Sequence, residues 1–239
     1  MRTKMIVLFG LLMLGLTVNM AAEQAAISVP VDNFDFGYVP RDANICHRFW
    51  LYSKGPDTLK ISNVRPGCGC TKAPLDKAIV APGDSTAVEL IFNTKNYSGK
   101  VSKSATIMTN AIPATNRVSF SAFIIKDKDT TLPLAFTPEI VKIRCNNTKN
   151  HVKALVSIKN VSANDLMLAL DSYPDGLFEV KLPKKIKAGK QANAEIRISN
   201  KAAAFEKSFT IQVDDAEKTR FTIPVVYGDS LDNSVHTNR

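Results

Sequence analysis

The two halves of this sequence repeat one another at a nearly constant spacing. Residues of like character recur 107 positions later in the pairs Phe49 and Val156, Leu51 and Ile158, Leu59 and Leu166, Ile61 and Leu168, Ile79 and Ile186, and Asn93 and Asn200. Two short deletions shift only the last two strands. A chance match would not hold one spacing across five elements. We therefore predict one fold that is built twice, with about a hundred residues in each copy, a common domain length.

Within each copy, apolar residues alternate with polar ones, which is the period of a β-strand. In the first copy, strand-length runs rich in β-branched and aromatic residues occur at 34–36, 45–51, 59–61, 87–91, 105–107 and 118–120. Turn-forming residues separate them, as at 54–57 (Lys-Gly-Pro-Asp) and 81–84 (Ala-Pro-Gly-Asp). About seven short strands, with no helix-period segment to compete, are typical of an immunoglobulin-like sandwich.

The predicted fold class is all-β, with two tandem immunoglobulin-like β-sandwiches after an N-terminal signal peptide. The first sandwich is predicted at 27–126 and the second at 130–228, followed by a polar tail at 229–239. The alternating charges of Lys-Asp-Lys-Asp at 126–129 suit an exposed linker between two domains.

The N-terminus has the layout of a secretory signal peptide. Arg2 and Lys4 form a positive region, residues 5–17 are an uninterrupted apolar-to-small run, and residues 20–22 end in small side chains. The apolar run is too short to span a bilayer comfortably as a permanent helix. We predict a cleaved signal peptide at 1–22, no membrane span in the mature chain, and a periplasmic or secreted location, where disulfides persist.

Charge and motifs exclude several classes of function. The formal net charge of +9 is spread along the chain, whereas a nucleic-acid-binding protein gathers its cations on one face with interleaved aromatic residues. We therefore expect no nucleic-acid partner. The chain has no Gly-x-Ser-x-Gly elbow, no glycine-rich phosphate loop and no His-Glu-x-x-His zinc motif. We predict that the protein is not an enzyme and needs no cofactor.

The two copies differ at residues 64–71, Val-Arg-Pro-Gly-Cys-Gly-Cys-Thr. Pro66 has no N–H for a strand ladder, and glycines permit backbone angles that other residues avoid. We expect a shaped corner here. The second copy has Asp-Gly-Leu at 175–177 in place of Cys68-Gly69-Cys70, so the fold itself does not require the sulfurs. The predicted binding or structural corner comprises Arg65, Cys68, Gly69, Cys70, Thr71 and Lys72.

The cysteines of the first copy allow three interpretations, of which a disulfide is the first. An exported chain with four cysteines favours at least one bridge. The candidates are Cys46, Cys68 and Cys70: either corner cysteine with Cys46, or Cys68 with Cys70. The sequence does not choose between them. A bridge between residues two apart closes a tight ring, and such bonds tend to be more easily reduced.

A metal site and thiol chemistry are the other two interpretations. Cys68 and Cys70 could bind Cu(I) or Zn(II) with His47 or Cys46 as a further ligand. Strand alternation places His47 on the inward face and Cys46 on the opposite face, so both are not expected at one ion. For thiol chemistry, the flanking cations Arg65 and Lys72 favour a thiolate. The chain lacks the thioredoxin-like Cys-x-x-Cys that opens a helix.

One set of ordered motifs in the first copy carries a family resemblance. The motifs are Phe36-Gly37, His47-x-Phe49-x-Leu51, Leu59-x-Ile61, Cys68-Gly69-Cys70-Thr71, Ala81-Pro82-Gly83 and Thr109-Asn110. Together they resemble a family of bacterial secreted domains of unknown function, which looks like a branch of the Hydin and major-sperm-protein type of immunoglobulin fold. The resemblance covers roughly residues 31–125. It implies a sandwich and an envelope location, but no established activity.

The sequence favours a non-enzymatic, exported envelope protein that binds or scaffolds other molecules through loops and sheet edges. Its expected partner is a protein or another component of the envelope. The alternative is a thiol-redox or soft-metal (Cu or Zn) handling protein centred on Cys68 and Cys70. Because the sulfur corner is built only once, we expect the first copy to carry the specific interaction and the second to position it.

Overall fold

The computed structural model describes residues 24–126, 132–145, 152–174, 176–199 and 204–228. These residues form eighteen strands and no helix, so the predicted all-β class is confirmed. The predicted signal peptide at 1–22, most of the linker at 126–129 and the tail at 229–239 lie outside the described residues. In the described part of the chain, no helix is long and apolar enough to cross a membrane.

The first sandwich consists of two sheets that face each other across one core. Its strands are β1 (Ile27–Ser28), β2 (Asn33–Pro40), β3 (Asn44–Ser53), β4 (Leu59–Pro66), β5 (Thr71–Lys72), β6 (Ile79–Val80), β7 (Ser85–Asn93), β8 (Gly99–Thr109) and β9 (Thr115–Ile125). One sheet has the order β1-β3-β7-β5, and the other has the order β2-β9-β8-β4-β6. Phe49, Phe92 and Phe120 are buried between them.

The second sandwich has its own core, which includes Val156, Phe178 and Phe209. Its strands are β10 (Leu134–Thr137), β11 (Val141–Arg144), β12 (Lys153–Asn160), β13 (Leu166–Ser172), β14 (Phe178–Lys181), β15 (Lys185–Ile186), β16 (Gln191–Ile198), β17 (Phe205–Val213) and β18 (Arg220–Gly228). One sheet has the order β10-β12-β16-β14, and the other contains β15-β13-β17-β18 with β11 beside β18. These strands follow the order of the first nine. The division into separate domains stays a prediction.

Alternation along β3 decides which side chains reach the core. Phe49 and Leu51 point inward and are fully buried, whereas Trp50 between them points to the outer face. The neighbouring strand β7 is in register with this pattern, since Phe49 lies opposite Val88 and Trp50 lies opposite Ala87. The outer face of β3 therefore offers large side chains that the core does not use.

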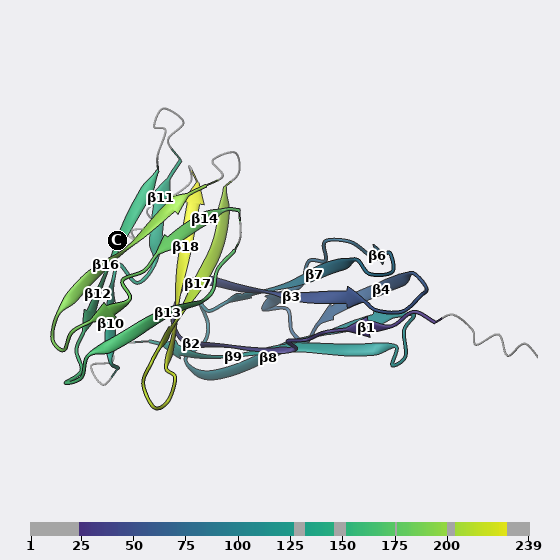
Figure 1. Cartoon of the computed structure of the whole chain (residues 1–239), viewed down its shortest axis with the longest axis horizontal. Helices are drawn as coiled ribbons and strands as arrows, with labels where there is room; N and C mark the ends of the chain where they lie inside the picture. The colour runs from purple at the N-terminus through teal and green to yellow at the C-terminus, as the bar shows by residue number, and fades with distance from the viewer. Residues whose placement is uncertain (1–23, 127–131, 146–151, 175, 200–203, 229–239) are drawn as a thin grey trace, which may run out of the picture.

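The two sandwiches are joined by strands as well as by side chains. Phe221 of β18 pairs with Tyr38 of β2 in parallel, which links one sheet of each sandwich into a ten-stranded sheet. Tyr38 and Ile125 of the first sandwich also pack against the second core. The strands of the two sandwiches run in markedly different directions, so the molecule is bent at this junction (Figure 1).

Candidate functional site

The junction buries polar side chains that would otherwise face water. Ser208 and Thr222, on the outer faces of β17 and β18, are almost fully buried against the first sandwich. The Thr222 hydroxyl donates a hydrogen bond of 2.7 Å to the carbonyl oxygen of Phe36. The N–H of Cys46 donates to the Ser208 hydroxyl at 3.1 Å, which in turn donates to the Cys46 carbonyl oxygen at 3.3 Å. These polar groups are satisfied across the junction, which fixes how the sandwiches meet.

An ion pair adds to the same contact. Lys207 of β17 pairs with Glu89 of β7, and the two side chains are only 19% and 9% exposed. Asn44 of β3 donates a further hydrogen bond to Glu206. A charge as deeply buried as Glu89 needs its partner, because an unpaired charge in this position would lose its hydration without compensation. The relative placement of the sandwiches therefore depends on these residues.

A groove of about 1030 Å³ lies beside the junction. The first sandwich lines it with residues of β3, the start of β2 and the segment before it, and the second lines it with the end of β13, the loop that follows and residues of β17 and β18. Trp50 of β3 and Tyr173 of the loop are 45% and 44% exposed. The groove thus has partly exposed aromatic side chains on two walls that come from different sandwiches.

The cations that line the groove have carboxylate partners among the described residues. Arg220 Nε lies 3.4 Å from an Asp171 carboxylate oxygen but makes no hydrogen bond, and Lys207 pairs with Glu89. Arg48 pairs with Asp76, and its guanidinium lies 5.3 Å from the centre of the Trp50 ring. Because these cations are already paired, the groove does not favour a strongly anionic ligand over a neutral one.

His47 forms the floor of the groove. Its ring stacks on Phe34 at 3.7 Å between centroids and contacts Phe49 edge-on, so the predicted inward orientation is correct. Nδ1 lies 3.2 Å from the Ser172 hydroxyl, within hydrogen-bond distance. Burial lowers the pKa of His47 to about 4, so the imidazole is neutral at physiological pH.

The predicted corner is a turn at the end of β4. Val64, Arg65 and Pro66 belong to that strand, so the expected corner is shorter than residues 64–71. Cys68 and Cys70 are joined in a disulfide. The Thr71 hydroxyl lies 3.5 Å from Sγ of Cys68, while Arg65 and Lys72 are exposed. None of the corner residues lines the groove.

The structure therefore does not have the disulfide between Cys46 and the corner that the sequence left open. By strand alternation Cys46 shares the outer face of β3 with Trp50, and it is buried beside Ser208 of the second sandwich, whereas Cys70 packs against the core of the first. Burial, followed by the nearby Glu89 charge, raises the pKa of the Cys46 thiol to about 12, so it is unreactive. Cys145 is half-buried, with Sγ 3.2 Å from the Tyr227 hydroxyl.

The structure does not bring together Cys68, Cys70 and His47, the ligands of the alternative metal site. Both sulfurs are in the disulfide, and His47 is held in the aromatic stack near the junction. Across the described ranges, no three His, Cys, Asp or Glu side chains are grouped closely enough to hold a metal ion.

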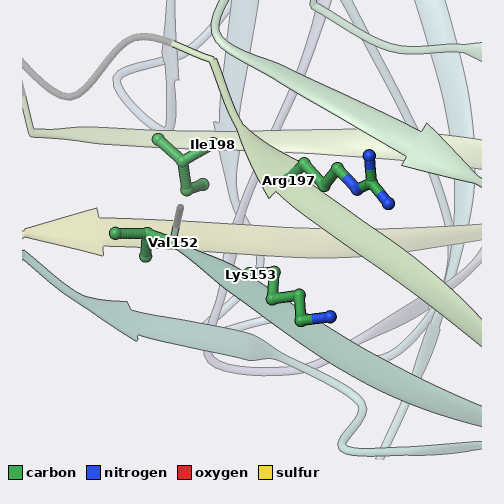
Figure 2. Close-up of a pocket in the computed structure, with 4 residues that line it drawn as sticks. All are labelled: Val152, Lys153, Arg197 and Ile198. Atoms are coloured by element: carbon green, nitrogen blue, oxygen red, sulfur yellow. The ribbon is translucent and has the colours of Figure 1, made fainter. Parts of the chain in front are cut away.

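A second, smaller hollow of about 260 Å³ lies on the second sandwich between β12 and β16. Figure 2 shows that Lys153 and Arg197 extend in the same direction from these strands, away from Val152 and Ile198. Both cations pair with the one carboxylate of Glu195. This hollow is lined by fewer polar and aromatic side chains than the groove.

The sequence alone did not indicate the groove, and of its lining residues only Cys46 and His47 were candidates, as a disulfide partner or metal ligands. Two signals could have indicated it. Trp50, the chain's one tryptophan, occupies an outward position of a predicted strand. In addition, Pro30 stands where the second copy has Thr137 at the same spacing of 107.

Comparison with known proteins agrees with the unknown-function family expected for the first copy. Residues 27–124, which are the first sandwich, match the family described as "Protein of unknown function (DUF1573)". No protein of curated function matches the sequence significantly.

The solved structures that match this chain are distant in sequence. A crystal structure of a protein of unknown function from Porphyromonas gingivalis is 13% identical, covers 84% of this chain and 98% of its own, and has a TM-score of 0.37. The ASH/PapD-like domain 7 of human CEP192 is 10% identical. The match covers 43% of this chain and 87% of that domain, with a TM-score of 0.35. A chimeric titin is 8% identical. The match covers 86% of this chain and 97% of the titin chain, with a TM-score of 0.30.

Proposed function

We propose that this protein is an exported, non-enzymatic binding protein and that the groove between its two sandwiches is the ligand site. The observation that carries the proposal is a large groove at a fixed junction. The bonds of Ser208 and Thr222 and the pair Lys207–Glu89 hold its walls in place before a ligand arrives. Less ordering entropy is then lost on binding. Trp50 and Tyr173 supply aromatic contact area, as hot-spot residues do.

The chemistry of the groove supports binding rather than catalysis. His47 and Ser172 lie at the distance of a base and a nucleophile. However, a pKa of about 4 makes His47 a weak base at neutral pH, and its ring packs against Phe34, Phe36 and Phe49. We therefore assign His47 to shaping the groove floor.

The proposed location is the cell envelope or its exterior. The disulfide between Cys68 and Cys70 is of the kind that persists in an oxidising compartment. The partner is a protein or another molecule of the envelope that meets the groove outside the cytoplasm. In this proposal both sandwiches contribute to recognition, which differs from the expectation that the first alone carries it.

A cross-linking capture from native envelopes tests the assignment. The chain with Trp50→Ala and Tyr173→Ala should lose the partner that the wild type captures. The matched control is Ile79→Ala with Ile112→Ala, which truncates two exposed side chains that are absent from the groove lining. If capture survives the groove variant but fails with Cys68→Ser/Cys70→Ser, the ligand site is the corner and this assignment is wrong.

The alternative, a thiol-redox function at the corner, rests on one observation. The disulfide joins residues only two apart in a turn whose neighbours Arg65 and Lys72 are exposed cations. A bond in such a position can exchange with an attacking thiolate. Incubation with reduced glutathione, followed by mass analysis of mixed disulfides, tests it: a corner that stays unmodified argues against exchange.

A further inference from the structure

One edge of β3 is open where it borders the groove. β7 pairs with β3 from Asn44 to Tyr52, but on the opposite side β1 pairs only with Tyr52 and Ser53. The Ser208 side chain of β17 covers Cys46 on that side, but within the described part of the chain no strand pairs with β3 between Cys46 and Tyr52 there. The N–H of Cys46 points to this side, as its bond to Ser208 shows. Because strand backbones alternate, the N–H and C=O groups of Arg48 and Trp50 point the same way.

The second sandwich shows how the same edge looks when it is covered. There β10 pairs with β12 over four residues, from Leu134 opposite Asn160 to Thr137 opposite Ser157. At the spacing of 107, Trp50 is the counterpart of Ser157, and Pro30 is the counterpart of Thr137. In the first sandwich, β1 stops two residues short of the position that would pair with Trp50.

The missing N–H of Pro30 explains this difference. The N–H of Lys54 donates to the carbonyl oxygen of Ala26, and Ser28 lies opposite Tyr52. In an antiparallel pair, hydrogen-bonded positions recur every second residue, so the next would join Pro30 and Trp50. Proline cannot donate that bond. Strand β1 therefore ends, and the backbone beside Trp50 faces the groove.

We propose that an extended peptide segment of a partner protein binds in the groove as an added strand on the Arg48–Trp50 edge of β3. The inference rests on the proposed function of the groove and names the occupant. Main-chain hydrogen bonds would supply affinity and the flanking side chains specificity, as in other cases of strand addition. The internal precedent is β10, which occupies the equivalent edge of the second sandwich.

The lining predicts the character of this peptide. Alternate side chains of an added strand point to opposite faces. One set meets Trp50 on the outer face of β3, and the other meets the stacked rings of Phe34 and His47. Since the cations of the groove are already paired, the peptide should be rich in apolar residues and carry little charge. A glycan could stack on the aromatic rings, but it would leave the strand edge without a matching ladder.

The first experiment uses a phage-displayed library of random nonapeptides, selected against the purified full-length mature protein. Selected peptides are synthesised, and amide hydrogen exchange is measured with and without each peptide. Exchange at Arg48 and Trp50 should slow at least tenfold in the complex, because their N–H groups enter a ladder. N-methylation of the alternate peptide residues whose N–H groups point to β3 should abolish binding. N-methylation of the residues between them should leave binding unchanged.

The second experiment closes the edge from within the chain. Pro30→Thr restores the donor that Thr137 has in β10, so β1 should lengthen and peptide affinity should fall at least tenfold. Pro82→Thr, in an exposed turn, is the matched control and should bind as the wild type does.

Three outcomes would overturn the proposal: no peptide selected above background, binding that leaves Arg48 and Trp50 amides unprotected, or indifference to N-methylation. Binding of the protein to a member of an oligosaccharide array, lost in Trp50→Ala, would instead identify a glycan site. In each of these cases the proposed binding function still stands if Trp50→Ala/Tyr173→Ala abolishes capture from envelopes, so the two failures are distinguishable.

Discussion

Gly37 of β2 lies directly against the backbone of Arg220 in β18, so closely that an added Cβ atom would fall 2.1 Å from the Arg220 carbonyl oxygen. Gly37 also has a φ of +63°, a region that other residues rarely adopt. The contact lies one residue from Tyr38, which pairs with Phe221 to link the two sheets. A glycine at position 37 therefore permits this close backbone approach of the two sandwiches.

Gly37→Ala is expected to loosen the junction. A positive φ costs a non-glycine residue on the order of 1–3 kcal/mol, and the clash with a backbone atom adds to that cost. Gly83→Ala is the matched control, because Gly83 has a φ of +78° with no atom within 4 Å. Urea denaturation should show the larger loss for Gly37→Ala, and small-angle scattering should show a more extended molecule. Equal losses for the two variants would contradict the role assigned to Gly37.

Lys207→Met is expected to destabilise the protein by about 3 kcal/mol or more, because it leaves the Glu89 carboxylate buried without its partner. The double variant Lys207→Met/Glu89→Leu should recover much of the loss, since both charges are then gone. Lys77→Met is the control, because its partner Asp84 is exposed and the change should matter little. Thermal unfolding measures all three; a double variant no better than Lys207→Met would argue against the buried pair.

The fold could be predicted from the sequence because its signal is local. Alternation along β3 placed Phe49 inward and His47 on the same face, and both orientations are correct. The junction could not be predicted in this way. Ser208 and Thr222 are polar residues at outward positions, which normally indicate solvent, yet here they are buried against a second sandwich that satisfies their hydrogen bonds. Nothing in a strand pattern states which outer face will be covered.

Reduction of the Cys68–Cys70 disulfide is expected to have a small effect on stability. Loop-closure entropy gives about 1.5 kcal/mol for a ring this short, compared with about 3 kcal/mol for the loop of more than twenty residues that a bridge to Cys46 would close. Reductant should raise the number of alkylated cysteines by two under denaturing conditions and lower the melting temperature only slightly. A large drop would mean that the corner holds more of the first sandwich than its short ring implies.

Cleavage in the linker is expected to leave the two sandwiches associated. Trypsin should cut after Lys126 or Lys128, a region largely outside the described residues. The buried contacts of Glu89 with Lys207 and of Phe36 with Thr222 do not depend on that segment. Size exclusion of the cut protein should therefore give one peak containing both fragments, and the Gly37→Ala protein should separate more readily. Immediate separation of the cut wild-type protein would show that the junction is weaker than these contacts imply.

The corner was found in the sequence because its cysteines and glycines are conspicuous, whereas the groove was not. The groove depends on how two sandwiches are placed and on the absence of one hydrogen-bond donor at Pro30. Both are relations between distant residues: Trp50 and Tyr173 are far apart in the chain and line one groove only because Ser208 and Lys207 fix the junction.

The free energy of unfolding should fall as the pH is lowered, because His47 has a lower pKa in the folded protein than in the unfolded chain. Burial lowers that pKa to about 4 from an ordinary value of 6.5, so the unfolded chain binds a proton more readily than the folded protein between these two values. The neutral ring contributes its full stabilisation above about pH 6.5, and this contribution is lost as the pH falls towards 4, by at most about 3 kcal/mol. His47→Phe keeps an aromatic ring against Phe34 but cannot titrate. Urea denaturation at pH 7.5, 6 and 4.5 should show a steeper loss for the wild type than for His47→Phe, while the carboxylates contribute equally to both. Parallel curves for the two proteins would mean that His47 takes up its proton in the folded state as readily as in the unfolded chain.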